Sequence, residues 1–299
     1  MVKSITDILN SNNFDSKKLS EIQINHLEDK GYLLLEPKKH FWDWIGCNPK
    51  ELRKVIDNIK LKEGDKAGSE GKEENTVLRN KTIEPGANRV GNLLDKSEYM
   101  KKIATLPEIL WSSYLTIKGE IKLSSVLFRE PKKDSGDQQL HIDWKPRKNI
   151  KENFKVVVAF LYLEDSTKKN GATKLVPGSH KILSYPDKYV DPKLPHKKEI
   201  TVEAKAGSVL IINGLLWHKG GNNFSGEKRG IVVVEYRSRE LKQLLNLKKY
   251  IKRETQENLN ENEKYLFGLR DDDVTQDEKS YGPGDDYRTW LKKNKNILR

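Results

Sequence analysis

The spacing of apolar residues divides the chain into three parts. Up to residue 117, apolar side chains recur at intervals of three and four residues, which predicts helices over 16–30, 48–60 and 97–114. From residue 118 to 239 the pattern changes to short apolar or alternating runs separated by glycine, proline and asparagine, which is typical of strands and turns. After residue 239 a helical spacing returns among many charged residues.

The middle part is expected to form strands with no helices between them. Such a regular succession of short strands and turns favours an all-β sandwich or barrel, and we interpret it as a double-stranded β-helix, the jelly-roll variant. A further short buried strand is expected at 32–35, before the core begins. The strands expected in the core cover residues 121–128, 138–144, 154–163, 173–176, 199–204, 208–212, 215–218 and 230–236.

The predicted organisation is a mainly β protein with one catalytic domain overall. Residues 1–117 are expected to form an N-terminal helical flanking segment, residues 118–239 the jelly-roll core, and residues 240–299 a helical, charged C-terminal extension. A charged, glycine-punctuated stretch at 62–76 predicts a solvated loop, with an active-site lid as the alternative. The extension should begin with a helix at 241–251, and its polar remainder is interpreted as a solvated tail or an oligomer contact.

The composition narrows the class of protein. The chain has 299 residues, and its 35% of hydrophobic residues are spread widely enough for one proper core. No apolar run approaches the roughly 18 residues of a membrane-spanning helix, and the first residues lack the apolar stretch of a secretory signal. Because Cys47 is the single cysteine, no internal disulfide can form, and we expect a cytoplasmic protein.

The net charge of +12 raises the question of an anionic partner. Nucleic acid, a membrane surface and an anionic small molecule are the classes to consider. However, 44 acidic residues are interleaved with 56 basic ones and no basic block is long. A lysine-rich, solvated surface is therefore the simpler interpretation.

The clearest chemical signal is a pair of metal-ligand types, His141 and Asp143, completed by His218. Residues two apart on an extended strand point to the same face. Two histidines and one carboxylate form a facial triad that leaves positions open on Fe(II) for a bidentate 2-oxo acid and O2. Eleven residues beyond His218, Arg229 opens an apolar run, and a guanidinium there could hold a carboxylate by two parallel hydrogen bonds.

Each of these residues also has a simpler interpretation. His141 and Asp143 could form an ordinary ion pair on a strand, His218 could be a hydrogen-bonded core histidine beside Trp217, and Arg229 could be a surface arginine. Taken together, they fall on neighbouring strand-like segments in the order that a metal centre requires. The joint pattern therefore favours the functional interpretation.

Further motifs accompany the triad: Leu-His-Ile-Asp at 140–143, Asn-Gly-Ala-Thr-Lys-Leu-Val-Pro-Gly-Ser-His-Lys at 170–181, His-Lys-Gly-Gly-Asn-Asn-Phe-Ser at 218–225 and Arg-Gly at 229–230. On these motifs the chain resembles the phytanoyl-CoA dioxygenase family of Fe(II)/2-oxoglutarate oxygenases. The resemblance covers about residues 118–237 and extends more loosely to the first helix. The segment at 170–181 makes it much more specific than the triad alone.

The resemblance implies a role for each matching residue. His141, Asp143 and His218 would ligate iron, Arg229 would pair with the distal carboxylate of 2-oxoglutarate, and Phe160 would pack against this co-substrate, although a core strand residue is an equally fair interpretation of Phe160. It further implies hydroxylation of a C–H bond with O2 and release of succinate and CO2. The carboxylate at position 143 argues against a halogenase, in which a small residue leaves space for halide.

Two positions depart from the family pattern. Relatives can carry a lysine that contacts the co-substrate before the proline that ends the first core strand, and here Glu130 precedes Pro131. A hydroxyl-bearing residue can occur two positions after the distal histidine, where this chain has Gly220. Both departures concern contacts to the co-substrate rather than to the metal.

The substrate is the least determined part of the prediction. Lys145, Arg147 and Lys148 follow the first two ligands, and Arg237 and Arg239 end the last strand. If these residues converge on the mouth of the site, they favour a small substrate with a carboxylate, phosphate, phosphonate or CoA-like group. A solvated rim is the alternative.

Two other functions stay open. A nucleic-acid-directed 2-oxoglutarate oxygenase would suit the positive charge, but the chain lacks the closely spaced arginine pair on the last strand that marks that group, and no basic stripe interleaved with aromatic residues is present. A non-catalytic jelly-roll binding protein, with a vestigial or zinc-holding triad, belongs to a different class. The small-molecule oxygenase is the hypothesis that the motifs favour.

Overall fold

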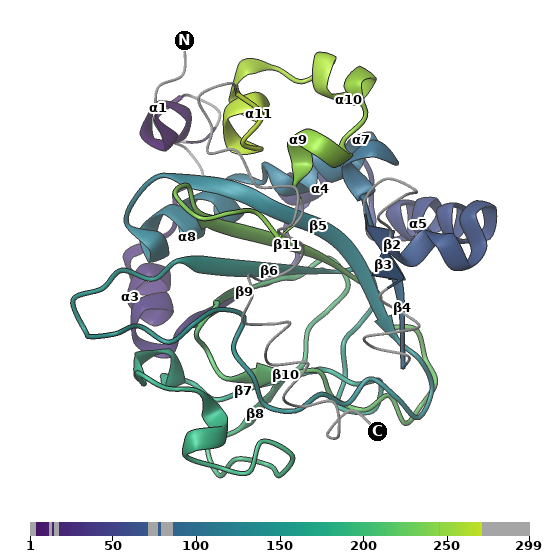
Figure 1. The fold of residues 1–299 in the computed structure, drawn as a ribbon. Helices are drawn as coiled ribbons and strands as arrows, with labels where there is room; N and C mark the ends of the chain where they lie inside the picture. The colour runs from purple at the N-terminus through teal and green to yellow at the C-terminus, as the bar shows by residue number, and fades with distance from the viewer. Residues whose placement is uncertain are drawn as a thin grey trace.

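The computed structural model describes residues 4–11, 14, 18–70, 77–78, 86–244 and 246–270. A large antiparallel sheet crosses the middle of the protein, with helices over one face and a small sheet opposite the other (Figure 1). None of the helices in the described ranges is long and apolar enough to cross a membrane.

The described chain contains short helices at both ends and strands between them. The α-helices are α1 (Ile5–Leu9), α3 (Glu21–Lys30), α4 (Lys39–Ile45), α5 (Pro49–Glu63), α7 (Glu98–Ala104), α8 (Pro107–Ile117), α9 (Leu247–Tyr250), α10 (Arg253–Glu257) and α11 (Glu261–Leu266). The strands are β1 (Tyr32–Leu35), β2 (Ser69–Glu70), β3 (Val77–Leu78), β4 (Ala87–Val90), β5 (Ile121–Pro131), β6 (Val156–Tyr162), β7 (Thr173–Leu175), β8 (Ile200–Val202), β9 (Val209–Asn213), β10 (His218–Lys219) and β11 (Ile231–Ser238). Short 3-10 turns occur at η1 (Gly64–Gly68), η3 (Leu93–Asp95), η4 (Ser179–Lys181) and η5 (Pro186–Lys188).

The two facing sheets pair strands that are distant in sequence. The large sheet has the order β1-β9-β6-β11-β5-β4, and the small sheet has the order β10-β7-β8. The described strand pairings are antiparallel, and in the large sheet every neighbouring pair except β5 and β4 joins strands that are not consecutive in the chain. The predicted mainly β fold with a jelly-roll core is thus confirmed. The N-terminal segment supplies helices and also the two edge strands β1 and β4.

Strict alternation along β6 divides the buried residues into two cores. Val157, Ala159 and Leu161 belong to the core under the helices. Val156, Val158, Phe160 and Tyr162 belong to the core between the two sheets. Because successive strand residues point to opposite faces, a continuous apolar run such as β6 can serve both cores. The inner core lies beside the predicted metal ligands.

The helices begin where local capping groups are available. Asn48 caps α5 through a capping box with Glu51, and Pro49 occupies the first turn, as the sequence predicts. The first long helix, α3, starts at Glu21 rather than residue 16, because Ser20 accepts a hydrogen bond from the Gln23 backbone N–H. Residue 16, the expected first residue of this helix, lies outside the described residues.

Three predicted elements differ in the structure. Residues 138–144 form a loop with a single bridge at His141 instead of a strand. Residues 215–217 form a turn and coil, and β10 begins only at His218. In the stretch predicted as a solvated loop, α5 continues to Glu63 and is followed by η1 and β2, whereas 71–76 lie outside the described residues.

The predicted helix at 241–251 is reduced to the four residues of α9, because tertiary contacts compete for the backbone. The Leu244 N–H donates to Ser124 Oγ at 2.7 Å, and the Gln243 side chain donates to the carbonyls of Leu123 and Phe267 at 2.7 and 2.8 Å. These bonds hold residues 243–244 against β5 in a non-helical conformation. The one-domain organisation and the oligomer contact stay predictions.

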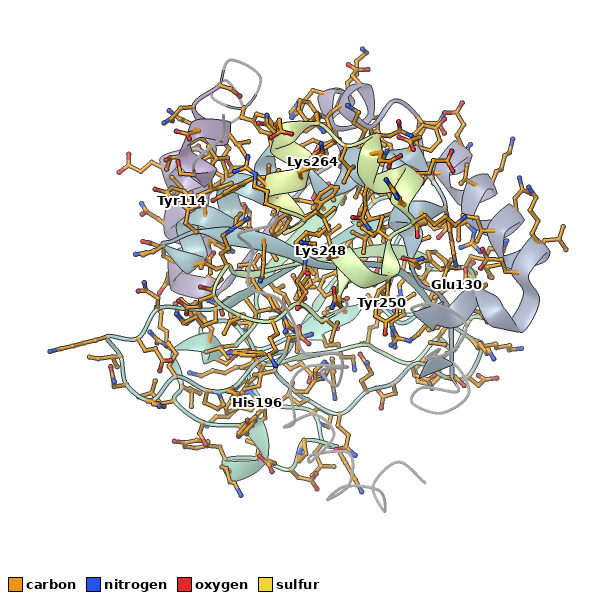
Figure 2. The ribbon with its side chains drawn as sticks, turned by 45° about the horizontal axis from the view of Figure 1, so that its top comes forward. Tyr114, Glu130, His196, Lys248, Tyr250 and Lys264 are labelled. Atoms are coloured by element: carbon orange, nitrogen blue, oxygen red, sulfur yellow. The ribbon has the colours of Figure 1, made fainter. Side chains whose placement is uncertain are left out.

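The C-terminal extension packs on the helical side of the large sheet. Figure 2 labels Lys248, Tyr250 and Lys264 on this segment, with Lys264 in the upper part of the view and His196 in the lower part. Its buried side chains include Tyr265, Leu266 and Phe267, which join the core under the helices. The sequence predicts a solvated tail or an oligomer contact for the polar remainder at 252–299. Its described part, up to residue 270, instead contains α10 and α11 and contributes to this core, whereas residues 271–299 lie outside the described residues.

Candidate metal centre

The structure brings the three predicted metal ligands together. The ligand atoms of His141, Asp143 and His218 all lie within 4.8 Å of one another, a cluster found among the described residues. The His218 Nε2 is 3.4 Å from one Asp143 carboxylate oxygen, and the His141 Nε2 is 3.9 Å from the other. His218 is buried, whereas the other two are partly exposed, so the cluster has one open side.

Main-chain hydrogen bonds hold the ligand loop in place although it is not a strand. The backbones of His141 and His218 exchange two hydrogen bonds of 3.0 Å each. The Asp143 N–H donates to the Gly214 carbonyl at 2.7 Å, and the Leu140 N–H donates to the Pro192 carbonyl at 2.9 Å. The loop is therefore attached at several points to the chain around β10, which carries the third ligand.

Both histidines are arranged to offer the same nitrogen to a metal. The His141 Nδ1 donates to the Gln139 carbonyl at 2.8 Å, and the His218 Nδ1 donates to the Leu216 carbonyl at 2.9 Å. Because a carbonyl can only accept, the proton is on Nδ1 and the Nε2 lone pair faces the carboxylate. Desolvation of the ring within the cluster and the nearby His218 lower the pKa of His141 below its usual value, which favours the neutral imidazole near pH 7. This donor set fits Fe(II).

Arg229 is fully buried immediately before β11. The next residue, Gly230, donates its N–H to the Glu164 carboxylate at 2.6 Å, which secures this end of the strand. Burial raises the pKa of Tyr162, and the positive charge of Arg229 acts against that rise, which places the guanidinium near the inner side of β6. Arg229 is therefore a buried residue at the end of the large sheet, and the interpretation as a surface arginine is wrong.

Phe160 lies on the inner face of β6, and its ring centroid is 6.4 Å from that of His218. The side chain is buried and belongs to the core between the sheets. It pairs in register with Val233 of β11 and Leu210 of β9. This position is compatible with both interpretations of Phe160: a residue of the inner core, and a residue that packs against the co-substrate.

Arg129 is a site residue that the sequence reasoning missed. Its Nη2 donates to the Gly136 carbonyl at 3.3 Å, and its charge contributes to the lowered pKa of His141. Arg129 pairs with Ile231, an inner-core residue, and is itself buried. Alternation along β5 was the signal that could have found it, because Arg129 must point opposite to its neighbour Phe128.

The two departures from the family pattern have local explanations. Glu130 points to the outer face, where its carboxylate is 2.5 Å from Arg53 of α5 and 3.2 Å from Lys60 (Figure 2). At Gly220 an added Cβ would lie 3.0 Å from both Gln138 Oε1 and the Gly136 carbonyl, so a larger side chain has little space. Glu130 consequently faces away from the metal centre, and the inner cation of β5 is Arg129.

The basic residues expected at the mouth have different environments. The Arg147 guanidinium donates to the carbonyls of Ile150 and Glu152 and stacks on Phe154, so it organises its own loop. The Arg239 guanidinium donates to the carbonyls of Ile121 and Tyr265. Arg237 alone of these three lies inside the protein, beside Trp144.

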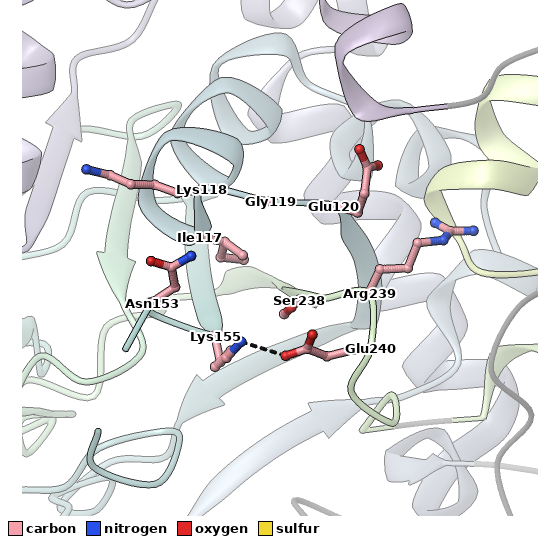
Figure 3. A pocket seen from close by; sticks show the side chains of 9 residues that line it. All are labelled: Ile117, Lys118, Gly119, Glu120, Asn153, Lys155, Ser238, Arg239 and Glu240. Atoms are coloured by element: carbon pink, nitrogen blue, oxygen red, sulfur yellow. Dashed lines mark hydrogen bonds and ion pairs between the residues drawn. The ribbon is translucent and has the colours of Figure 1, made fainter. Parts of the chain in front are cut away.

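A separate hollow of about 330 Å³ lies at the far end of the large sheet, between Ile117, Asn153 and Ser238 (Figure 3). Lys155 and Glu240 form an ion pair of 2.5 Å at its border. None of the three metal ligands lines this hollow. It is distinct from the metal centre.

The fold and the site define a class: jelly-roll proteins with a cluster of two histidines and one carboxylate that could hold a metal ion. Within that class, the sequence model of the phytanoyl-CoA dioxygenase (PhyH) family matches residues 27–231, and the chain belongs to this family. The resemblance stated from the motifs is confirmed. The matched range includes His141, Asp143, His218 and Arg229.

Relatives of known name support the same family. The dioxygenase af480 of Aspergillus fumigatus is 36% identical over 107 residues, which cover 34% of this chain and 33% of that protein. The chain thus matches about a third of the length of this curated relative. Among solved structures, HygX from Streptomyces hygroscopicus with nickel and 2-oxoglutarate bound has a TM-score of 0.58 and 15% identity, over 75% of this chain and 89% of its own.

A second solved structure has a similar fold. The non-heme alpha-ketoglutarate-dependent carbocyclase SnoK from nogalamycin biosynthesis has a TM-score of 0.54 and 16% identity, over 75% of this chain and 86% of its own. At this level of identity both structural comparisons establish the fold.

Proposed function

We propose that the protein is an Fe(II)/2-oxoglutarate-dependent dioxygenase that hydroxylates a C–H bond of a small molecule. The observation that carries this proposal is the convergence of two Nε2 lone pairs and one carboxylate, each histidine with its tautomer set by a carbonyl. Membership of the phytanoyl-CoA dioxygenase family supports it. When bound, iron and 2-oxoglutarate supply the oxidising chemistry, which consumes O2 and releases succinate and CO2.

In this proposal, different side chains of the site bind the metal and the co-substrate. His141, Asp143 and His218 hold the metal, and the partly exposed side of the cluster admits the co-substrate and the substrate. Arg229 binds the distal carboxylate of 2-oxoglutarate, since a buried guanidinium is a strong, directional partner for a carboxylate. Phe160 covers the co-substrate from the inner core. HygX, a solved structure of similar fold, has been seen with nickel, 2-oxoglutarate and hygromycin B, which supports a small-molecule substrate.

The apolar inner core has a further role in this proposal. Val158, Phe160, Leu210 and Ile212 are buried between the sheets on one side of the metal centre. They exclude water from that side, which strengthens the interaction between Arg229 and a carboxylate. They also leave the open side of the triad as the route for substrate.

The proposal is tested by anaerobic titration of the metal-free protein with Fe(II) and then 2-oxoglutarate, following the weak visible charge-transfer band of the chelate. The parent protein should develop the band, and the His218→Ala variant should not. Arg229→Lys keeps the charge but loses the planar fork, and should weaken 2-oxoglutarate binding about tenfold. The neighbouring Lys228→Gln, which changes an exposed side chain, is the matched control and should bind normally. A folded parent without a band contradicts the proposal.

A further inference from the structure

Arg237 is a buried cation on the inner face of β11. The residue is 1% exposed and ranks among the largest fully buried side chains of the protein. In register it pairs with Lys122 on β5 and with Val156 on β6. Val156 belongs to the core between the sheets, which shows that this part of the strand faces inward. A charge in such a position requires partners.

The partners of Arg237 satisfy only part of its guanidinium. The Nε forms an ion pair with Glu235, and the Nη1 donates to the Lys242 carbonyl at 3.0 Å. The guanidinium stacks on the Trp144 ring at 4.9 Å from its centroid. The Nη2 is buried and has no hydrogen-bond partner among the residues that the structure describes. Because an unsatisfied buried donor is unfavourable, this nitrogen is the atom that a ligand would complete.

A chain of contacts connects Arg237 to the metal centre. Trp144, on which it stacks, directly follows the metal ligand Asp143. The Asp143 N–H donates to the Gly214 carbonyl, and the Gly214 N–H donates to the Val156 carbonyl at 2.8 Å. Val156 is in turn the strand partner of Arg237. Arg237 therefore lies on the side of the metal centre where Asp143 is attached.

Arg237 and Arg229 cannot bind the same small co-substrate. They are separated by eight positions along nearly the whole of β11, which corresponds to roughly 26 Å at the usual rise of an extended strand. 2-Oxoglutarate is much shorter than this distance. If Arg229 holds the co-substrate, Arg237 is available to a second molecule.

The surroundings of Arg237 favour an anionic group on that molecule. Lys122 lies opposite on β5 and is 1% exposed, while Glu235 is the buried carboxylate that pairs with the arginine. An oxyanion such as a carboxylate or a phosphate ester on the second molecule would accept a charge-assisted hydrogen bond from the Arg237 Nη2.

We propose that Arg237, supported by Trp144, binds a carboxylate or phosphate group of the primary substrate and thereby sets its orientation at the metal centre. This inference rests on the proposed oxygenase function, and it assigns the substrate-recognition residue of that same site. It separates Arg237, which is fully buried, from Arg147 and Arg239, which are partly exposed.

The test is calorimetric titration of the protein loaded with Ni(II) and 2-oxoglutarate. Hexanoate and hexyl phosphate are the anionic probes, and hexanamide is the neutral probe of similar size. The parent should bind at least one anion about tenfold more tightly than hexanamide. Arg237→Gln should remove this preference, whereas Arg147→Gln, the matched control, should keep it. The stronger anion distinguishes a carboxylate from a phosphate substrate.

A second variant guards against misfolding of Arg237→Gln. Glu235→Gln leaves the arginine without its anionic partner, so it should bind the preferred anion several-fold more tightly than the parent does. Equal binding of anionic and neutral probes by the parent, no binding of either anion, or an unchanged preference in Arg237→Gln would overturn the inference. So would unchanged or weaker anion binding in Glu235→Gln.

Failure of this inference can be told apart from failure of the proposed function. If the parent and Arg237→Gln both develop the Fe(II)–2-oxoglutarate band but show no anion preference, only the role of Arg237 is wrong. If the parent develops no band, the oxygenase proposal fails, and the anion titration no longer reports on a substrate.

Discussion

Each ligand histidine donates its Nδ1 proton to the carbonyl of the residue two positions before it. The pairs are His141 with Gln139 and His218 with Leu216. This bond is local in sequence, so each imidazole can be oriented before the two segments meet. The shared arrangement leaves both Nε2 atoms as the metal-facing donors, which is the function of such bonds in metal sites.

His180 offers a test of burial at the scale of one residue. It is 1% exposed, and its Nε2 donates to the Glu28 carbonyl at 3.2 Å. Burial lowers the pKa of His180 from 6.5 to about 4. The unfolded chain therefore binds a proton at His180 at a higher pH than the native protein does. The stability that the neutral, buried His180 contributes is fully present above about pH 6.5 and is lost as the pH falls toward 4.

We expect the free energy of unfolding to fall by about 2 kcal/mol between pH 7 and pH 5 through His180 alone. The measurement is urea unfolding of the metal-free protein at several pH values, compared with His180→Gln. Gln keeps a donor toward Glu28 but does not titrate, and His141 titrates equally in both proteins. The variant should therefore show a shallower pH dependence. Parallel curves would contradict the prediction.

At the scale of elements, the turn before β7 supports the ligand on β10. Gly171 has a φ of +89°, and a Cβ there would lie 2.6 Å from the Gly221 carbonyl oxygen. The turn is further held by the bridge between Asn170 and Asn223. Since His218 lies three residues before Gly221, close packing at Gly171 helps to position the third ligand.

Gly171→Ala should lower the free energy of unfolding by about 2 kcal/mol, because alanine is strained at positive φ and its Cβ meets backbone. The midpoint of urea unfolding measures this change. Gly119→Ala is the matched control: a Cβ at Gly119 has nothing within 4 Å, and its effect should stay within about 1 kcal/mol. Equal stability of the two variants would show that the turn can relax at little cost.

At the scale of the whole molecule, the metal centre joins segments that meet only in the folded protein. His141 and Asp143 lie on the loop after β5, and His218 begins β10 on the small sheet. The unfolded chain does not hold these three groups together. A metal ion that binds the native state must therefore stabilise the fold.

Ni(II) at a hundred times its dissociation constant should raise the free energy of unfolding by about 2.7 kcal/mol. The expected observation is a shift of the urea unfolding curve that saturates with added metal. His218→Ala should show no such shift, whereas His26→Ala, which removes a partly exposed histidine away from the cluster, should respond as the parent does. A similar shift in His218→Ala would mean that Ni(II) binds elsewhere.

Patterns within single segments predicted much of this protein. The continuous apolar run of β6 and the helix expected from residue 48 each depend on near neighbours in the chain, so their structures follow from local geometry. The candidate ligands followed from residue types whose chemistry suits Fe(II). The opposite orientations of Arg129 and Glu130 could also be inferred from the sequence, because adjacent residues on a strand face opposite sides of the sheet.

Long-range contacts decided the rest. Residues 138–144 alternate like a strand, but hydrogen bonds to Pro192, Gly214 and His218 hold them as a loop. The apolar spacing at 241–251 gives a helix only at α9, because the backbone of Leu244 bonds to Ser124 instead. The sequence by itself thus determined which residues could form strands, caps and metal ligands. Only the tertiary structure decided which of these groups meet, since partners distant in the chain compete for the same hydrogen bonds.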